Sequence, residues 1–89
     1  MDTTTTVIFR TFPDGDVIAL MPYELADDDG HITSYQHIGQ HGAADYHYCI
    51  EVSRAAADSE RAPLLRELQQ IGYIVKEAKR ASGAYRRRR

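Results

Sequence analysis

The sequence contains little of the cysteine that cross-links small proteins or binds metal ions in them. Its 89 residues include a single cysteine, Cys49. One cysteine excludes a disulfide within the chain and every zinc site that takes two or more cysteines from one chain. A chain of this length is sized for one domain with one core, so we expect packing alone to hold the fold.

Long apolar runs are also missing. No run approaches the roughly 20 residues that span a bilayer. The start, Met1-Asp2-Thr3, is polar and acidic, whereas a signal peptide begins with a basic and then an apolar region. The sequence therefore predicts a cytoplasmic protein that does not enter a membrane.

The motifs of several common enzyme classes do not occur. The chain has no Gly-x-x-x-x-Gly-Lys loop, no Gly-x-Gly-x-x-Gly and no Gly-x-Ser-x-Gly. The run Asp27-Asp28-Asp29-Gly30 lacks the alternating ligand spacing of a calcium loop. We expect a protein without enzymatic activity and without a cofactor.

Charge is present but unevenly distributed. Residues 1–60 carry eleven acidic and two basic side chains, whereas residues 61–89 carry nine basic and two acidic ones, for a net charge of -2. Such an asymmetry bears on partners and solubility rather than on the fold.

Hydrophobic periodicity predicts a hairpin at the start of the chain. Residues 5–12 and 16–21 are rich in β-branched and apolar residues, and Pro13-Asp14-Gly15 between them fits a three-residue loop with Gly15 in the left-handed region. Both arms carry apolar residues on both faces, which predicts strands covered on both sides. Pro22 is expected to end the second strand.

The rest of the chain predicts two further strands, a helix and a closing strand. A third strand over residues 32–38 is broken by the glycines of 39–42, and a fourth is expected over 45–53, where apolar and polar residues alternate. A helical stripe after Ala55 predicts a helix of about 13 residues, capped by Asp58 or Ser59 and ended by Gly72. A closing strand is expected over 73–80.

These elements predict an α+β fold: a mostly antiparallel sheet of four to five strands with one amphipathic helix on one face, in the order ββββαβ. The domain is expected to cover residues 1–81, followed by a basic disordered tail over 82–89. Because one helix covers only one face, the other face is expected to need a partner, and a two-fold homodimer is predicted. The apolar residues available for that face include some of Ile8, Phe12, Ile18, Leu20, Tyr35 and Tyr73.

The segment from Ser34 to Gly42 concentrates hydrogen-bonding side chains around two glycines. We predict that this segment, with the sheet edge beside it, binds a protein partner. The alternative is a structural loop in which these side chains satisfy backbone groups. The candidate binding residues are Tyr35, Gln36, His37, Gln40 and His41.

A zinc site remains open as an alternative. A zinc ion has a possible ligand set if the loop folds over the fourth strand, although the spacing alone does not form a site. His47 and Cys49, two apart on a strand, are about 7 Å from each other, beyond the reach that a nucleophile and its base require. The metal-ligand candidates are His37, His41, His47 and Cys49.

Nucleic acid is the other alternative partner. The basic C-terminal part has the charge for phosphate contacts, but the acidic remainder opposes them, so weak and non-specific binding at most is expected. The residues concerned are Lys76, Lys79, Arg80, Arg86, Arg87, Arg88 and Arg89.

Four segments of the chain form a recognisable set: residues 7–10, 15–20 with Pro22, 34–42 and 68–73. Together they resemble a family of short, uncharacterised bacterial proteins carried on plasmids, integrated elements and phages. The resemblance implies a mobile-element origin and supplies no catalytic residues. By analogy with other small proteins of such elements, it suggests a host-interaction or anti-defence role.

Overall fold

The computed structural model describes residues 4–27, 30–36 and 40–80, which form an α+β fold as predicted. The sequence of elements is β-β-β-β-α-β-α-β, so it contains one helix and one short strand more than expected. The expected tail over 82–89 lies outside the described residues. The elements are β1 (Thr4–Thr11), β2 (Val17–Leu25), β3 (Ile32–Gln36), β4 (Gln40–Ala44), α1 (Tyr46–Val52), β5 (Arg54–Ala55), α2 (Asp58–Ile71) and β6 (Ile74–Glu77).

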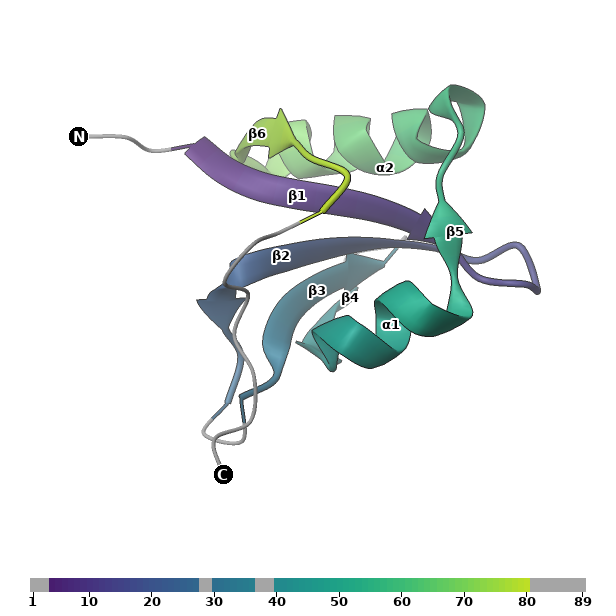
Figure 1. Cartoon of the computed structure of the whole chain (residues 1–89). Helices are drawn as coiled ribbons and strands as arrows, with labels where there is room; N and C mark the ends of the chain where they lie inside the picture. Colours follow the sequence, from purple (N-terminus) through teal and green to yellow (C-terminus); the bar gives the residue numbers. More distant parts are fainter. Residues whose placement is uncertain (1–3, 28–29, 37–39, 81–89) are drawn as a thin grey trace.

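One mostly antiparallel sheet organises the chain (Figure 1). Its order is β4-β3-β2-β1, and two short strands share the outer edge of β1. β6 runs parallel to the first half of β1, from Thr4 to Val7, and β5 runs antiparallel to its end, at Arg10 and Thr11. The sheet therefore has one edge covered by two strands and another formed by β4.

The first hairpin is confirmed. Phe12 N donates to Asp16 O at 2.8 Å, and Gly15 N donates to Phe12 O at 2.9 Å, which closes the predicted three-residue loop. Gly15 has φ of +94°, the left-handed conformation expected there.

Pro22 does not end the second strand, contrary to the prediction. β2 continues to Leu25 because its pairing with β3 shifts between Met21 and Leu25. Pro22 lies inside this irregularity and is buried. A proline is tolerated in a bulge because no ladder hydrogen bond requires its missing N–H.

The predicted fourth strand over 45–53 is wrong, because residues 46–52 form helix α1. Asp45 caps the helix by accepting a hydrogen bond from Tyr48 N at 3.0 Å. Tyr46 and Cys49 are buried while Tyr48 is 61% exposed, so the side chains follow a helical period. Over so short a stretch, the alternation of aromatic and polar residues fits the period of two residues of a strand as well as the helical period.

The predicted break at 39–42 is also wrong where it is described. Gln40–Ala44 forms β4, which pairs antiparallel with β3 from Gln36↔Gln40 to Ile32↔Ala44. The predicted third strand ends at Gln36 in the described residues, and residues 37–39 lie outside them.

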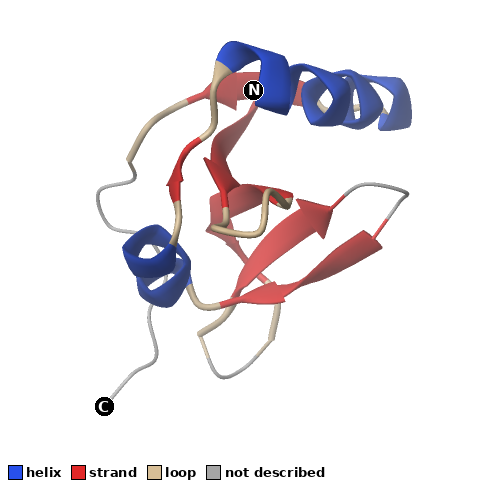
Figure 2. Ribbon diagram, turned by 90° about the vertical axis from the view of Figure 1, so that its right-hand side faces the viewer, coloured by secondary structure: helices blue, strands red, loops and turns tan. Residues whose placement is uncertain are grey.

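Both faces of the sheet are covered, so the expected open face does not exist. Figures 1 and 2 show α2 on one side of the strands and α1 on the other. Leu64 and Leu68 of α2 pack in one buried cluster with Phe9 and Tyr35. Tyr46 and Cys49 of α1 pack in the second cluster, which includes Ile8, Ile18 and Leu20. The apolar residues assigned to an open face therefore give no reason for a homodimer.

Helix α2 confirms the predicted helix and its end at Gly72, with a correction at its start. The cap residue is Ala57 rather than Asp58 or Ser59, and the Glu60 carboxylate accepts from Ala57 N at 2.8 Å. Gly72 has φ of +121°, and its N–H donates hydrogen bonds to the carbonyls of Gln69 and Leu68. Glu60, at the third helical position, thus supplies one half of a capping box by accepting from the N–H of the cap residue.

Among the described residues, no helix is long and apolar enough to cross a membrane.

Candidate functional site

The outer edge of β4 is the candidate site, and hydrogen-bond alternation shows which of its backbone groups point outward. Phe12 and Asp16 are a hydrogen-bonded pair of the β1–β2 ladder. Since bonding pairs alternate in antiparallel strands, Ile18 directs its backbone toward β1 and Ala19 toward β3.

The same alternation continues to the edge. Ala19 pairs with Tyr35, so Tyr35 bonds back to β2 and its neighbour Ser34 bonds to Gly42 of β4. The N–H and C=O groups of His41 and Ala43 therefore point away from the sheet. No strand of the described residues pairs with this side of β4.

In the described part of the chain, this edge has no charged residue, proline or bulge to protect it against pairing. Natural edge strands use lysine, other charges, proline or bulges to prevent contact with another strand. β4 reads Gln-His-Gly-Ala-Ala, and its pairing with β3 is regular throughout. His41, Gly42 and Ala43 are exposed. The edge is thus a regular, uncharged and accessible row of backbone donors and acceptors.

Side chains from distant parts of the chain hold β4 in place. His41 Nε2 and Tyr73 Oη share a hydrogen bond of 3.0 Å, and the rings of His41 and Tyr35 meet edge to face at 4.9 Å. Tyr35 Oη donates to Glu67 Oε1 of α2 at 2.8 Å. These contacts connect the edge strand to α2 and to the residue before β6.

The environment of Tyr73 suits a hydrogen-bond partner of His41. Burial, with a smaller contribution from the charge of Glu24, raises the pKa of the Tyr73 hydroxyl. A tyrosine hydroxyl is already protonated at neutral pH, and the upward shift preserves this state, which allows the hydrogen bond with His41.

The structure separates the predicted binding residues. Tyr35 is 2% exposed and belongs to the core rather than to the surface. His41 is exposed on β4, and Gln36 is half-buried on β3. Gln40 contributes its backbone to β4, and His37 lies outside the described residues.

The described members of the predicted zinc set do not meet. His41 packs against Tyr35 on the α2 side of the sheet, whereas Cys49 is buried in the cluster on the α1 side. His47 is exposed on α1, with its ring against Tyr46. In the described part of the chain, no three His, Cys, Asp or Glu side chains group as metal ligands do.

Cys49 and His47 also do not form a nucleophile and base. These residues belong to a helix and not to the predicted strand. Side chains two residues apart on a helix point in different directions, so Cys49 is buried while His47 is exposed. Burial, with a smaller contribution from Asp45, raises the pKa of the Cys49 thiol, which disfavours the reactive thiolate.

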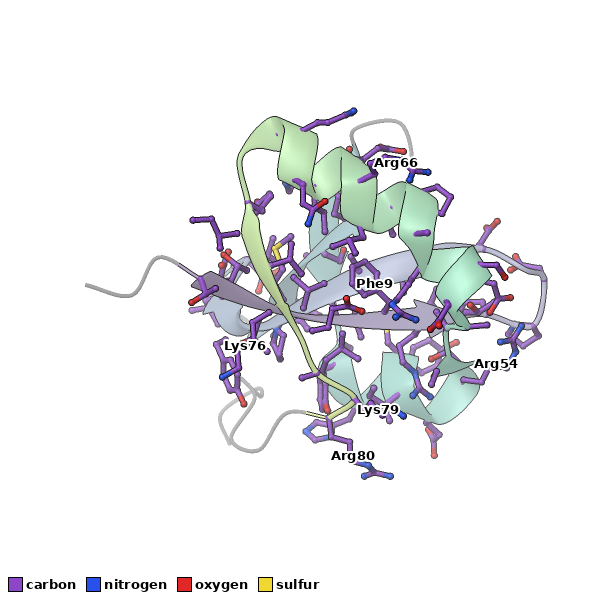
Figure 3. All side chains as sticks on the ribbon, turned by 90° about the horizontal axis from the view of Figure 1, so that it is seen from above. Phe9, Arg54, Arg66, Lys76, Lys79 and Arg80 are labelled. Atoms are coloured by element: carbon purple, nitrogen blue, oxygen red, sulfur yellow. The ribbon has the colours of Figure 1, made fainter. Side chains whose placement is uncertain are left out.

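The described residues of the nucleic-acid alternative lie at the other edge of the sheet. Lys76, Lys79 and Arg80 are exposed on β6 and the segment after it (Figure 3). The four terminal arginines, 86–89, lie outside the described residues.

Sequence reasoning missed Ala43, Glu67 and the strand that carries the edge. A signal for this strand was present, because 37–39 ends in glycine as the loop 13–15 does. Residues 13–15 lie between Phe12 and Asp16, and residues 37–39 lie between Gln36 and Gln40. In both cases the two flanking residues pair with each other across neighbouring strands. No local signal indicates Glu67, which meets Tyr35 across 32 positions of sequence.

Comparisons with known proteins identify no relative: no family model, no curated protein and no solved structure matches the chain. The resemblance to proteins of mobile elements stays a prediction.

Proposed function

We propose that this protein is a non-enzymatic binding module that adds an extended segment of a partner protein to the edge of β4. The observation that carries the proposal is the outward-facing backbone of His41 and Ala43 at the end of a regular sheet, where no strand of residues 4–27, 30–36 and 40–80 pairs with it. Strand addition is a common mode of peptide recognition, in which backbone hydrogen bonds provide affinity and neighbouring side chains provide selectivity.

The contacts that hold β4 in place support this function. β4 is held by its ladder to β3 and by the hydrogen bond from His41 to Tyr73. A strand that is ordered before binding loses little conformational entropy when the partner adds to it. The partner, rather than this protein, is expected to become ordered on binding.

The side chains beside the edge indicate what the partner segment contains. Gly42 and Ala43 are small and exposed, so they leave space above the strand. No Lys, Arg, Asp or Glu stands on β4 to attract or repel a charge. We expect an extended, uncharged segment with β-branched or aromatic residues, which suit a pleated surface.

The test compares two substitutions at one position. Ala43→Pro removes the outward N–H and leaves the β3 ladder intact, whereas Ala43→Ser preserves the backbone. Each form is used to capture protein from nuclease-treated bacterial lysate. The partner is expected with the wild-type and Ala43→Ser forms and absent with Ala43→Pro.

Hydrogen exchange with the captured partner then locates the contact. The amides of His41 and Ala43 are expected to become protected while Gly42, already bonded to β3, changes little. Retention of the partner by Ala43→Pro, or recovery of nucleic acid instead of protein, contradicts the proposal. If light scattering shows that the chain pairs only with a second copy of itself, the foreign partner is wrong.

A further inference from the structure

A cavity lies at the other edge of the sheet, where β5 and β6 leave a gap along β1. β6 pairs with β1 as far as Val7, and β5 begins its pairing at Arg10. Backbone contacts flank the gap, because Val7 O accepts from Ala78 N at 3.0 Å and Phe9 O accepts from Ala56 N at 3.1 Å.

The cavity has a volume of about 340 Å³. Ligand sites for small molecules begin at about 300 Å³ and combine apolar walls with a few polar groups. Phe9 and three alanines form the apolar part of the lining. The lining residues are Phe9, Arg10, Ala55, Ala56, Asp58, Arg61, Glu77, Ala78 and Lys79.

The charges on one side of the cavity neutralise each other. Arg61 pairs with Asp58 on α2 and, through Nε at 2.5 Å, with Glu77 Oε1 on β6. The two carboxylates therefore already have a cationic partner, and a second cation gains little from them.

The cations on the opposite side have no carboxylate partner among the described residues. Arg10 donates to Ser53 Oγ at 3.0 Å, Ile50 O at 3.1 Å and Ser53 O at 2.6 Å, all of them uncharged oxygens. Burial lowers the pKa of Arg10, while the charge of Tyr46 raises it and that of Arg80 lowers it to a smaller extent. Lys79 adjoins Arg80 and lines the cavity.

We infer that this cavity binds a small organic anion, with its carboxylate or phosphate beside Lys79 and its apolar part against Phe9 and the alanines. The anion supplies a negative partner for Lys79, and the cavity removes the apolar part from water. The site is distinct from the β4 edge and does not depend on strand addition there.

Phenyl phosphate is the probe, titrated into the full-length protein and followed by amide chemical shifts. Saturable shifts are expected at lining residues, including Ala56 and Lys79. Inorganic phosphate and benzyl alcohol, which carry only the charge or only the ring, are each expected to bind at least about five-fold more weakly.

Two lysines of one segment provide matched variants. Lys79→Ala is expected to weaken phenyl phosphate binding about three- to five-fold, the range of one solvent-exposed charge contact. Lys76→Ala, three residues earlier and outside the cavity lining, is expected to leave binding unchanged. Ala78→Leu occupies the cavity and is expected to abolish the saturable shifts.

Each opposite result overturns the inference. Equal losses in Lys76→Ala and Lys79→Ala mean attraction by diffuse surface charge. Equal binding of benzyl alcohol means that no anion is recognised, and equal binding of inorganic phosphate means that the apolar lining contributes nothing. Absence of saturable shifts with the wild-type protein, or their survival in Ala78→Leu, excludes a site in this cavity.

Discussion

The two edges of the sheet differ in how they are protected. The outer edge of β1 is covered by β5 and β6, and ion pairs tie these strands to α2: Arg54 Nη2 lies 2.7 Å from Glu60 Oε2, and Arg61 bridges to Glu77. β4 has neither a covering strand among the described residues nor a charged side chain. Local order at β4 comes instead from buried and half-buried aromatic contacts behind it.

The chain therefore treats its two edges differently: β5 and β6 close the edge at β1, whereas aromatic contacts only hold β4 in place. Exposed edges are an aggregation hazard, and proteins usually block them. At β1 the chain does so with its own backbone. At β4 it fixes the strand from one face and leaves the edge groups accessible, which is the arrangement required to bind another strand.

The largest expected change in stability concerns helix α1, which joins the two edges of the sheet. α1 leads from β4 to β5 across one face of the sheet (Figure 1). Tyr46→Ala is expected to lower the free energy of unfolding by about 3–5 kcal/mol because Tyr46 is 6% exposed. Tyr48→Ala, at a side chain 61% exposed, is expected to change it by less than about 0.5 kcal/mol. Urea denaturation measures both, and equal effects contradict the helical assignment.

The next effect tests which backbone groups of β4 face outward. Gly42→Pro removes an N–H that bonds to β3 and is expected to cost about 3 kcal/mol or more. Ala43→Pro removes an outward N–H and is expected to cost about 1 kcal/mol at most. Urea denaturation distinguishes the two variants. A reversed order means that Ala43, and not Gly42, bonds to β3.

At the protected edge, Glu60 provides a test by pH. Its hydrogen bonds with Arg54, Ala57 N and Thr11 lower the pKa of the Glu60 carboxyl from 4.5 to about 2. Because the folded protein holds the charged form, this contribution to stability is complete above about pH 4.5 and is lost as the pH falls toward 2.

Glu60→Gln removes that contribution. The variant is expected to melt several degrees below the wild-type protein at pH 6, and the two melting temperatures are expected to converge near pH 2. Thermal unfolding across this range measures the difference. A constant gap between the two proteins indicates that Glu60 stabilises the fold without its charge.

The smallest effect contrasts two glycines. Gly72 has φ of +121°, so Gly72→Ala is expected to cost about 1 kcal/mol through backbone strain. A methyl group at Gly42 meets Ser34 Oγ at 3.5 Å, an ordinary contact, so Gly42→Ala is expected to change stability by less than about 0.5 kcal/mol. Calorimetry measures both. A large loss in Gly42→Ala means that β4 approaches β3 more closely than the structure shows.

Much of the fold could be predicted because its signals are local. The β1–β2 hairpin follows from β-branched residues on either side of Pro13-Asp14-Gly15, and α2 follows from an apolar stripe that ends at Gly72. Residues 45–52 could not be assigned in the same way. Tyr46, Tyr48 and Ile50 satisfy a period of two, while Tyr46, Cys49 and Ile50 satisfy a helical period, and only packing distinguishes them.

The candidate site was partly predictable. The sequence singled out His41 and a sheet edge beside its segment, but it did not predict the strand β4, and Tyr35, which was placed on the binding surface, lies in the core. The contacts of both residues, Glu67 and Tyr73, are 32 positions away in the chain. Sequence patterns report near neighbours along the chain and do not report such pairs.

By itself, the sequence determined the α+β class, the first hairpin, the long helix and the division of charge, because residue preferences and short spacings decide these features. Only the tertiary structure decided that both faces of the sheet are covered and that β4 remains an edge. Whether a polar segment becomes a loop or an edge strand depends on which surfaces the rest of the chain has already buried. Here α1 covers the face that one helix alone would have left open.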